Sequence, residues 1–418
     1  MLGPRTPDPR QTVEQVVRAH GPRVLSGLVS YFGGGRTGFG LAEDAWQDAL
    51  AVALETWPVA GVPANPSGWL VVTARRKALD RIRRRAVRAD KHGELEVEAR
   101  LAHDDAAGDV PDIPDERLAL VFTCCHPALS EEARVALTLR TMCGLSTPEL
   151  ARCFMLPEPT VQQRIVRAKR KIEEARIPYR VPERAELPER LSSVLAVVYL
   201  VFNEGYAATA GELLRVDLCE EALRLGALLV ELLPDEPEAH GLLALMALHH
   251  ARRGSRVDAD GVLVTLEEQD RSTWDRVAID QADERLRAAL ARRAIGPYQV
   301  QAAIAAVHAR AVRPEDTDWW QIVGLYAALH ALAPTPVVAL NAAAALAMAA
   351  GPEVGLERLA DPSIAGPLAE YHLLHAARAD LCRRLGQLDQ AREHYRAALA
   401  RATNEAERRY LRRRLEQG

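Results

Sequence analysis

Residues 145–172 read LSTPELARCFMLPEPTVQQRIVRAKRKI, a pattern that predicts two short helices with a tight break at Leu156-Pro157. After Pro159, apolar residues recur at the period of a helix, so one face can pack against a core. These residues are Val161, Ile165, Ala168 and Ile172. The other face is cationic, and residues 159–176 hold six Lys or Arg against two Glu. The stretch is either a DNA-reading helix-turn-helix, whose second helix enters the major groove, or an ordinary helical hairpin with a solvated basic face.

A second basic segment, SGWLVVTARRKALDRIRRRAVRADKH, covers residues 67–92 and carries nine Lys or Arg against two Asp. The whole chain has a net charge of only -4, so any electrostatic footprint for nucleic acid has to be local. Two basic helices in separate blocks favour a duplex with two contact points. Membrane-surface or calmodulin-type binding is the competing use of such helices, but their apolar stripes lack a bulky insertion face.

Composition predicts an all-α globular protein. The chain has 418 residues, of which 48% are hydrophobic, enough for a sizeable core. Ala, Leu, Arg and Glu dominate at three-and-four spacing, whereas alternating β-branched runs are missing. The N-terminus lacks the apolar core of a signal peptide, and no run reaches the roughly 18 apolar residues of a membrane span. We therefore expect a cytoplasmic protein without membrane contact.

The cysteines predict neither disulfides nor a metal site. They do not repeat a CxxC spacing, and the adjacent pair in TCCHP is poorly placed to share one tetrahedral ion. The six residues are Cys124, Cys125, Cys143, Cys153, Cys219 and Cys382. Because a free cysteine behaves as a small apolar residue, we expect buried structural thiols.

Composition shifts divide the chain into blocks. They are a helical block at 10–88, an acidic Pro-containing linker at 89–116, a second helical block at 117–177 and a long Ala/Leu-rich block at 188–418. In the last block, Ala344 and Ala379, and likewise Gly351 and Gly386, are thirty-five residues apart. This weak repeat resembles a tetratricopeptide (TPR) helix pair, and such hairpins stack because one alone cannot bury its own face.

The order of these features resembles a sigma factor of the sigma-70 family, in its extracytoplasmic-function (ECF) group. LAEDAWQDALAVALETW, residues 41–57, is similar to the helix that binds the clamp helices of core RNA polymerase. NPSGWLVVTARRKALDRIRRR, residues 65–85, resembles the helix that captures the melted -10 element, and residues 145–172 resemble the region-four helix-turn-helix that reads the -35 element. The last block resembles the TPR-like regulatory extension of one ECF subgroup.

The resemblance implies functional positions in three groups. The polymerase-facing positions are Asp44, Trp46, Gln47 and Asp48, with core packing as the alternative for Trp46. The positions near the -10 strand are Asn65, Arg75, Arg76, Arg83 and Arg84. The positions of the -35 face are Glu158, Thr160, Gln163, Arg164 and Arg167, followed by Arg170 and Lys171. Met155 and Pro159 depart from the family's usual turn residues, which leaves the geometry of the turn open.

The implied function is promoter-specific transcription initiation, with core RNA polymerase and promoter DNA as partners and no cofactor. The resemblance leaves open an intramolecular contact of the C-terminal domain with the sigma domains. Polar and aromatic residues of that domain suit either a contact surface or simple capping and turn roles. They are Asn203, Glu204, Tyr206, Asp316, Asp318 and Trp319.

Two other classes of function compete with initiation. One is a polymerase-independent helix-turn-helix regulator with a ligand- or protein-sensing array, but such a regulator has no use for a polymerase-binding helix at residues 41–57. The other is an enzyme, and the sequence shows no nucleophile elbow, phosphate-binding loop or HExxH motif. We therefore expect no catalytic residues.

Overall fold

The computed structural model describes residues 9–32, 35–89, 116–154, 156–208 and 213–417. The chain divides into two compact units, Met1–Val197 and Val198–Gly418. Helices dominate both units, and the β-structure found in the described ranges is one isolated bridge between Val257 and Leu263. The predicted all-α class is confirmed.

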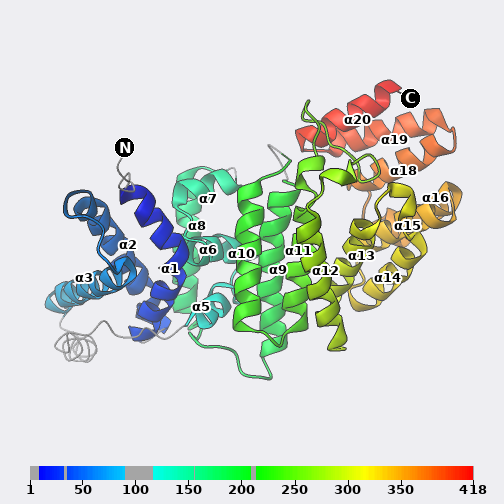
Figure 1. Ribbon diagram of the computed structural model, residues 1–418. Coiled ribbons are helices and arrows are strands. Elements are labelled where there is room, and N and C mark those ends of the chain that lie inside the picture. Colours follow the sequence, from blue (N-terminus) through cyan, green and yellow to red (C-terminus); the bar gives the residue numbers. More distant parts are fainter. Residues whose placement is uncertain (1–8, 33–34, 90–115, 155, 209–212, 418) are drawn as a thin grey trace, which may run out of the picture. The chain divides into compact units, whose positions relative to one another are not determined.

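The first unit contains two groups of helices, drawn in blue and in cyan in Figure 1. The first group is α1 (Pro9–Tyr31), α2 (Gly35–Ala60) and α3 (Pro66–Ala89), and the second is α5 (Arg117–Cys124), α6 (Glu131–Met142), α7 (Thr147–Phe154) and α8 (Glu158–Glu174). The breaks after α1 and α2 fall in the Gly-rich and Pro-rich segments, where helix propensity is lowest. Trp57 of α2 and Trp69 of α3 pack edge to face, with ring centroids 5.6 Å apart. Most of the predicted linker, residues 90–115, lies outside the described residues.

The second unit is a succession of helices, coloured green to red in Figure 1. They are α9 (Leu187–Tyr206), which begins in the first unit, α10 (Val216–Leu232), α11 (Pro237–His250), α12 (Arg276–Ala291), α13 (Pro297–Arg310), α14 (Trp319–Leu332), α15 (Pro336–Ala350), α16 (Pro352–Leu359), α17 (Pro362–Ala365), α18 (His372–Arg384), α19 (Leu388–Arg401) and α20 (Glu405–Gln417). The repeated glycines of the sequence both follow a helix and have positive φ, +112° at Gly351 and +73° at Gly386. Only glycine adopts this backbone region without strain. The thirty-five-residue spacing therefore reflects a recurring helix end.

The first half of α9 is bonded to the first unit. The Arg190 guanidinium donates to the carbonyl of Phe122 at 2.6 Å, and the Ser193 hydroxyl donates to the carbonyl of Cys125 at 2.8 Å. These bonds satisfy carbonyls at the C-terminal end of α5, where a helix leaves its last carbonyl groups without internal partners. The boundary between the units at Val197 consequently lies within α9, beyond the predicted block end at residue 177.

No helix in the described ranges combines the length and apolarity that a membrane span requires. The described cysteines are buried thiols: Cys124, Cys125, Cys143, Cys219 and Cys382. The side chain of Cys153 lies outside the described part. Burial raises the pKa of the Cys125 thiol to about 11, against an opposing hydrogen bond from Thr138, so this sulfur stays protonated.

Candidate polymerase and promoter interface

Helices α7 and α8 form the predicted pair with a break at the predicted place. A capping box opens α7: the Ser146 amide donates to the Glu149 carboxylate at 2.6 Å, and the Glu149 amide donates to the Ser146 hydroxyl at 3.4 Å. Helix α8 begins at Glu158, so Pro159 lies in its first turn, where the missing N–H removes no helical bond. Met155, the other departure from the family's turn, lies outside the described residues.

Helix α8 has the two faces that its periodicity predicts. Its buried residues are Val161, Ile165, Ala168 and Ile172. Its exposed residues include every predicted -35 position except Arg164, namely Glu158, Thr160, Gln163, Arg167, Arg170 and Lys171. Arg164 is half-buried, with its guanidinium 5.8 Å from the centroid of the Phe154 ring. The exposed N-terminal turn carries the positive end of the helix dipole, which suits an approach to phosphates.

One cation of α8 is not on the open face. The Lys169 ammonium lies 2.5 Å from the carboxylate of Glu43 in α2, and Arg140 of α6 lies 3.6 Å from the same group. The Glu43 side chain is only 5% exposed, so this network is buried. The Tyr179 hydroxyl also donates to the carbonyl of Ser26 in α1 at 2.8 Å. The Glu43 ion pairs and the Tyr179 hydrogen bond join the two groups of helices. The sequence did not predict these contacts, because their partners are far apart along the chain.

The predicted polymerase-facing positions lie on α2. Asp44 and Asp48 are one turn apart and share one partner, Arg81 of α3, at 2.6 Å and 2.8 Å. The hydrogen bond to Asp48 and the charges of both carboxylates raise the pKa of Arg81 despite partial burial. Gln47 is exposed, whereas Trp46 is only 4% exposed. Trp46 thus occupies the core position that the sequence left as its alternative, and the polar atoms at the surface come from its neighbours.

The predicted -10 positions lie around α3. The Asn65 side chain accepts from the Gly68 amide at 2.9 Å and so caps the helix. The Arg75 guanidinium lies 4.1 Å from the centroid of the Tyr31 ring, a cation–π contact. Arg76 and Arg83 are exposed, and the side chain of Arg84 lies outside the described part. The exposed arginines leave a cationic surface along α3.

The polar residues predicted in the C-terminal domain divide between capping and cavity positions. The Asp318 side chain caps α14, and Asp316 pairs with a neighbouring arginine at 2.8 Å. Asn203 lines a cavity, whereas the Tyr206 ring lies under the guanidinium of Arg256 at 3.6 Å. Among the described residues, no cluster of three or more His, Cys, Asp or Glu is arranged to hold a metal ion.

Comparison with protein families assigns both groups of helices in the first unit. Residues 16–88 match sigma-70 region 2, and residues 119–172 match sigma-70 region 4. The chain carries the two domains of a sigma-70 factor. Sigma-70 domains imply binding to core RNA polymerase and promoter DNA, and the family is not enzymatic. The region 4 match contains α8, and the region 2 match contains α2 and α3.

A third stretch of the chain matches a family without an assigned role. Residues 190–290 match a family of unknown function, DUF6596. The chain is 41% identical over 403 residues to an uncharacterized protein of Rhizobium meliloti (strain 1021), an alignment that covers 94% of this chain and 93% of that protein. Both are therefore members of one family, and the alignment includes the C-terminal helical part of this chain. No solved structure matches the chain.

Proposed function

We propose that this chain is an ECF-type RNA polymerase sigma factor that binds core polymerase and directs promoter-specific initiation, with its C-terminal helical domain regulating that activity. The observation that carries the proposal is the pair of sigma-70 domains in order along the chain. The exposed face of α8 supports it, because that helix offers amide and guanidinium groups above a buried apolar stripe.

The side chains of α8 suit two kinds of DNA contact. Gln163 and Arg167 can pair with the edges of adenine and guanine in the major groove, whereas Arg170 and Lys171, further along the helix, suit phosphates. On α3, Arg76 and Arg83 can hold the backbone of a melted strand by charge. Sequence reading is therefore assigned to region 4 and strand capture to region 2.

The acidic surface of α2 favours this function over a polymerase-independent regulator. Asp44 and Asp48 are 47% and 36% exposed although both pair with Arg81. Their roles can be separated, because replacing Arg81 removes the pairing but leaves both carboxylates. Exposed ion pairs contribute about 0–1 kcal/mol to stability, so neither change should unfold the domain.

We expect the double variant Asp44→Asn, Asp48→Asn to bind core polymerase at least tenfold more weakly and to lose run-off transcription. Arg81→Gln, the matched control, should keep both activities, because the carboxylates stay in place. Co-sedimentation with core polymerase and run-off transcription measure the two properties. Equal losses in the two variants would assign the carboxylates to holding α2 against α3, and full binding by the double variant would refute the polymerase contact.

A further inference from the structure

The second unit contains a cavity of about 580 Å³ that no assigned function uses. Its walls come from α9, α11, α13, α14 and α15, with Trp274 from the segment before α12. The volume lies within the usual range for small-molecule sites, roughly 300 to 1,000 Å³. The apolar part of the lining includes Leu245, Leu248, Ile304, Leu329 and Val338. The cavity can therefore enclose an organic body of metabolite size.

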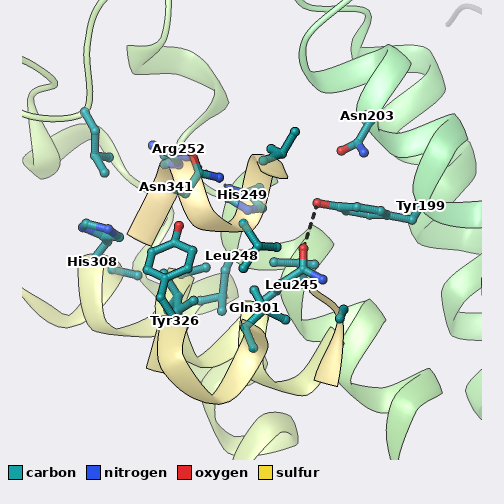
Figure 2. A pocket seen from close by; sticks show the side chains of 18 of the residues that line it. Tyr199, Asn203, Leu245, Leu248, His249, Arg252, Gln301, His308, Tyr326 and Asn341 are labelled. Carbon is teal, nitrogen blue, oxygen red and sulfur yellow. Dashed lines mark hydrogen bonds between the residues drawn. The ribbon is translucent and has the colours of Figure 1, made fainter. Parts of the chain in front are cut away.

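The polar part of the lining is made largely of neutral groups. It includes the side chains of Tyr199, Asn203, Gln301, Tyr326 and Asn341, which Figure 2 shows around the same space. The Tyr199 hydroxyl donates to the Gln301 amide oxygen at 3.4 Å. The buried Nδ1 of His308 has no hydrogen-bond partner within the described residues. A buried polar atom without a partner is costly, so a ligand group that bonds to it gains affinity.

Among the described residues that line the cavity, Arg252 carries the permanent charge and none is Asp or Glu. Both lining histidines are neutral at physiological pH. Burial, reinforced by the charges of Arg252 and Arg271, lowers the pKa of His308 to about 4. Burial and the charges of Arg252 and Arg256 hold the pKa of His249 well below its usual value. The cavity thus presents a single cation against neutral walls.

In the described part of the chain Arg252 contacts neutral groups, among them the Tyr206 ring, whose centroid lies 5.6 Å from the guanidinium. Its guanidinium bonds to Nδ1 of His249 at 3.1 Å, and no carboxylate in the described ranges pairs with it. The neighbouring arginines likewise bond to carbonyl oxygens: Arg271 to His308 at 3.0 Å and Arg276 to Ala309 at 2.8 Å. Arg271 is only 5% exposed, and burial together with Arg276 and Arg252 lowers its pKa. Arg252 and Arg276 are half-buried. Cations in partly buried positions that bond to neutral acceptors create a positive field that an anion would relieve.

We propose that this cavity binds a small organic acid, whose single carboxylate pairs with Arg252 while an aromatic or aliphatic body fills the apolar part. A guanidinium suits this task because its fork matches a carboxylate in two parallel hydrogen bonds. One lining cation selects for one negative charge, and the neutral amides and Nδ1 of His308 serve further polar groups of the ligand. The site deepens the regulatory role proposed for the C-terminal domain and rests on that role only for its effect on transcription.

The test is isothermal titration calorimetry of the full-length chain without polymerase. The chain is titrated with three compounds that share one carbon skeleton. 3-Phenylpropanoate, 3-phenylpropanamide and 3-phenylpropylamine carry charges of minus one, zero and plus one on the same body. The variant Arg252→Gln removes the lining cation. Arg253→Gln is the matched control, because Arg253 is the next residue, bonds to the carbonyl of His250 at 3.2 Å and does not line the cavity.

The acid should bind the wild-type chain at least tenfold more tightly than the amide, and the amine should not bind. Arg252→Gln should weaken the acid at least tenfold without changing the amide, and Arg253→Gln should change neither. Equal binding of acid and amide, an unchanged acid affinity in Arg252→Gln, or no binding of any probe at millimolar concentration would overturn the proposal.

A second variant covers the outcome in which Arg252→Gln does not fold. Ala305 lines the cavity from α13, so Ala305→Phe should fill it and abolish binding of the acid. Retained binding by a folded Ala305→Phe would place the site elsewhere and refute the assignment. Run-off transcription on the same wild-type preparation tests the sigma function separately from the acid-binding site. If the chain transcribes but does not bind the acid, only the binding site is refuted. If it binds the acid but does not transcribe, only the sigma function is refuted.

Discussion

Two basic residues within one turn of α8 have different surroundings. Arg167 is exposed on the predicted reading face, whereas Lys169, two residues later, is directed to the buried carboxylate of Glu43. Their side chains point about 200° apart around the helix axis, since each residue advances by about 100°. The local charge of the helix therefore overstates the charge available to DNA, and the reading face depends on fewer side chains than composition indicates.

We expect Arg167→Ala to weaken promoter binding by about 1–3 kcal/mol if Arg167 contacts a base, with little change in binding to core polymerase. If it contacts a phosphate, the loss should be uniform across sequences and the salt dependence should become shallower by about one ion. Fluorescence anisotropy of the holoenzyme on promoter and mutated duplexes, at several salt concentrations, distinguishes the two.

Arg184→Ala is the matched control, because Arg184 is exposed and lies beyond α8. An equal effect of Arg184→Ala would indicate nonspecific charge. Loss of polymerase binding by Arg167→Ala, instead of loss of promoter binding, would contradict the position of α8 on the -35 element.

Helix α3 combines a structural start with a functional surface. The side-chain oxygen of Asn65 caps the first turn of α3. Asn65 is also a predicted -10 residue, and its side-chain NH2 group takes no part in that capping bond. The cap needs only an oxygen acceptor, so the two roles of Asn65 can be separated by substitution. A loss of function after a change to alanine alone would not tell them apart.

We expect Asn65→Ala to destabilise the first unit by about 1 kcal/mol through loss of the cap, and Asn65→Asp to keep that stability because aspartate caps equally well. Asn65→Asp should nevertheless impair promoter opening, since a carboxylate repels the strand that the amide faces. Thermal melting and permanganate footprinting of the open complex measure the two effects. Normal opening by Asn65→Asp would restrict Asn65 to capping.

Periodicity predicts what a helix does locally, and it succeeds where local packing decides. The buried stripe of α8, the break before Glu158 and the helix ends at Gly351 and Gly386 all follow from spacing within one or two turns. Pairings between distant segments do not. Asp44 with Arg81 depends on where α3 returns beside α2, and no local pattern encodes that geometry.

The cavity of the second unit was outside the reach of the sequence for the same reason. The sequence left Asn203 open between a contact surface and a capping or turn role, and its companions Arg252, His308 and Asn341 come from separate helices and a turn. Their one common property, a position facing the same space, exists only after the helices have packed. Of the six polar and aromatic residues that the sequence singled out in the C-terminal domain, Asn203 is the one that lines the cavity.

The division of the chain at Val197 decides how the C-terminal domain should be removed. A fragment that ends at residue 180, near the predicted end of the second helical block, would lack Arg190 and Ser193, which bond to carbonyls of the first unit. A fragment that ends at Val197 keeps them. The comparison of the two separates loss of regulation from loss of support for region 4.

We expect fragment 1–197 to bind core polymerase and to differ at least severalfold from the whole chain in run-off transcription, because the domain proposed to regulate initiation is missing. Fragment 1–180 should melt at a lower temperature, since it has lost the bonds of α9. Circular dichroism melting and run-off transcription give the two readouts. Equal transcription by fragment 1–197 and the whole chain would assign the C-terminal domain a separate role.

The pairing of Glu43 with Lys169 holds the two groups of helices closer together than the -10 and -35 elements lie on a promoter. Elements at -10 and -35 are about 25 base pairs apart by their positions, or about 85 Å at roughly 3.4 Å per base pair. Helix α3, which carries the predicted -10 arginines, is held to α2 by the pairing of Arg81 with Asp44, the residue after Glu43. Helices α3 and α8 have 24 and 17 residues, so they would reach only about 62 Å if laid end to end. A factor that reads both elements at once has to break this contact first. Each 1.4 kcal/mol that the contact contributes then lowers the fraction of open factor, and its apparent affinity for a promoter with both elements, about tenfold. We therefore expect residue 43 to set a threshold for basal transcription without touching DNA.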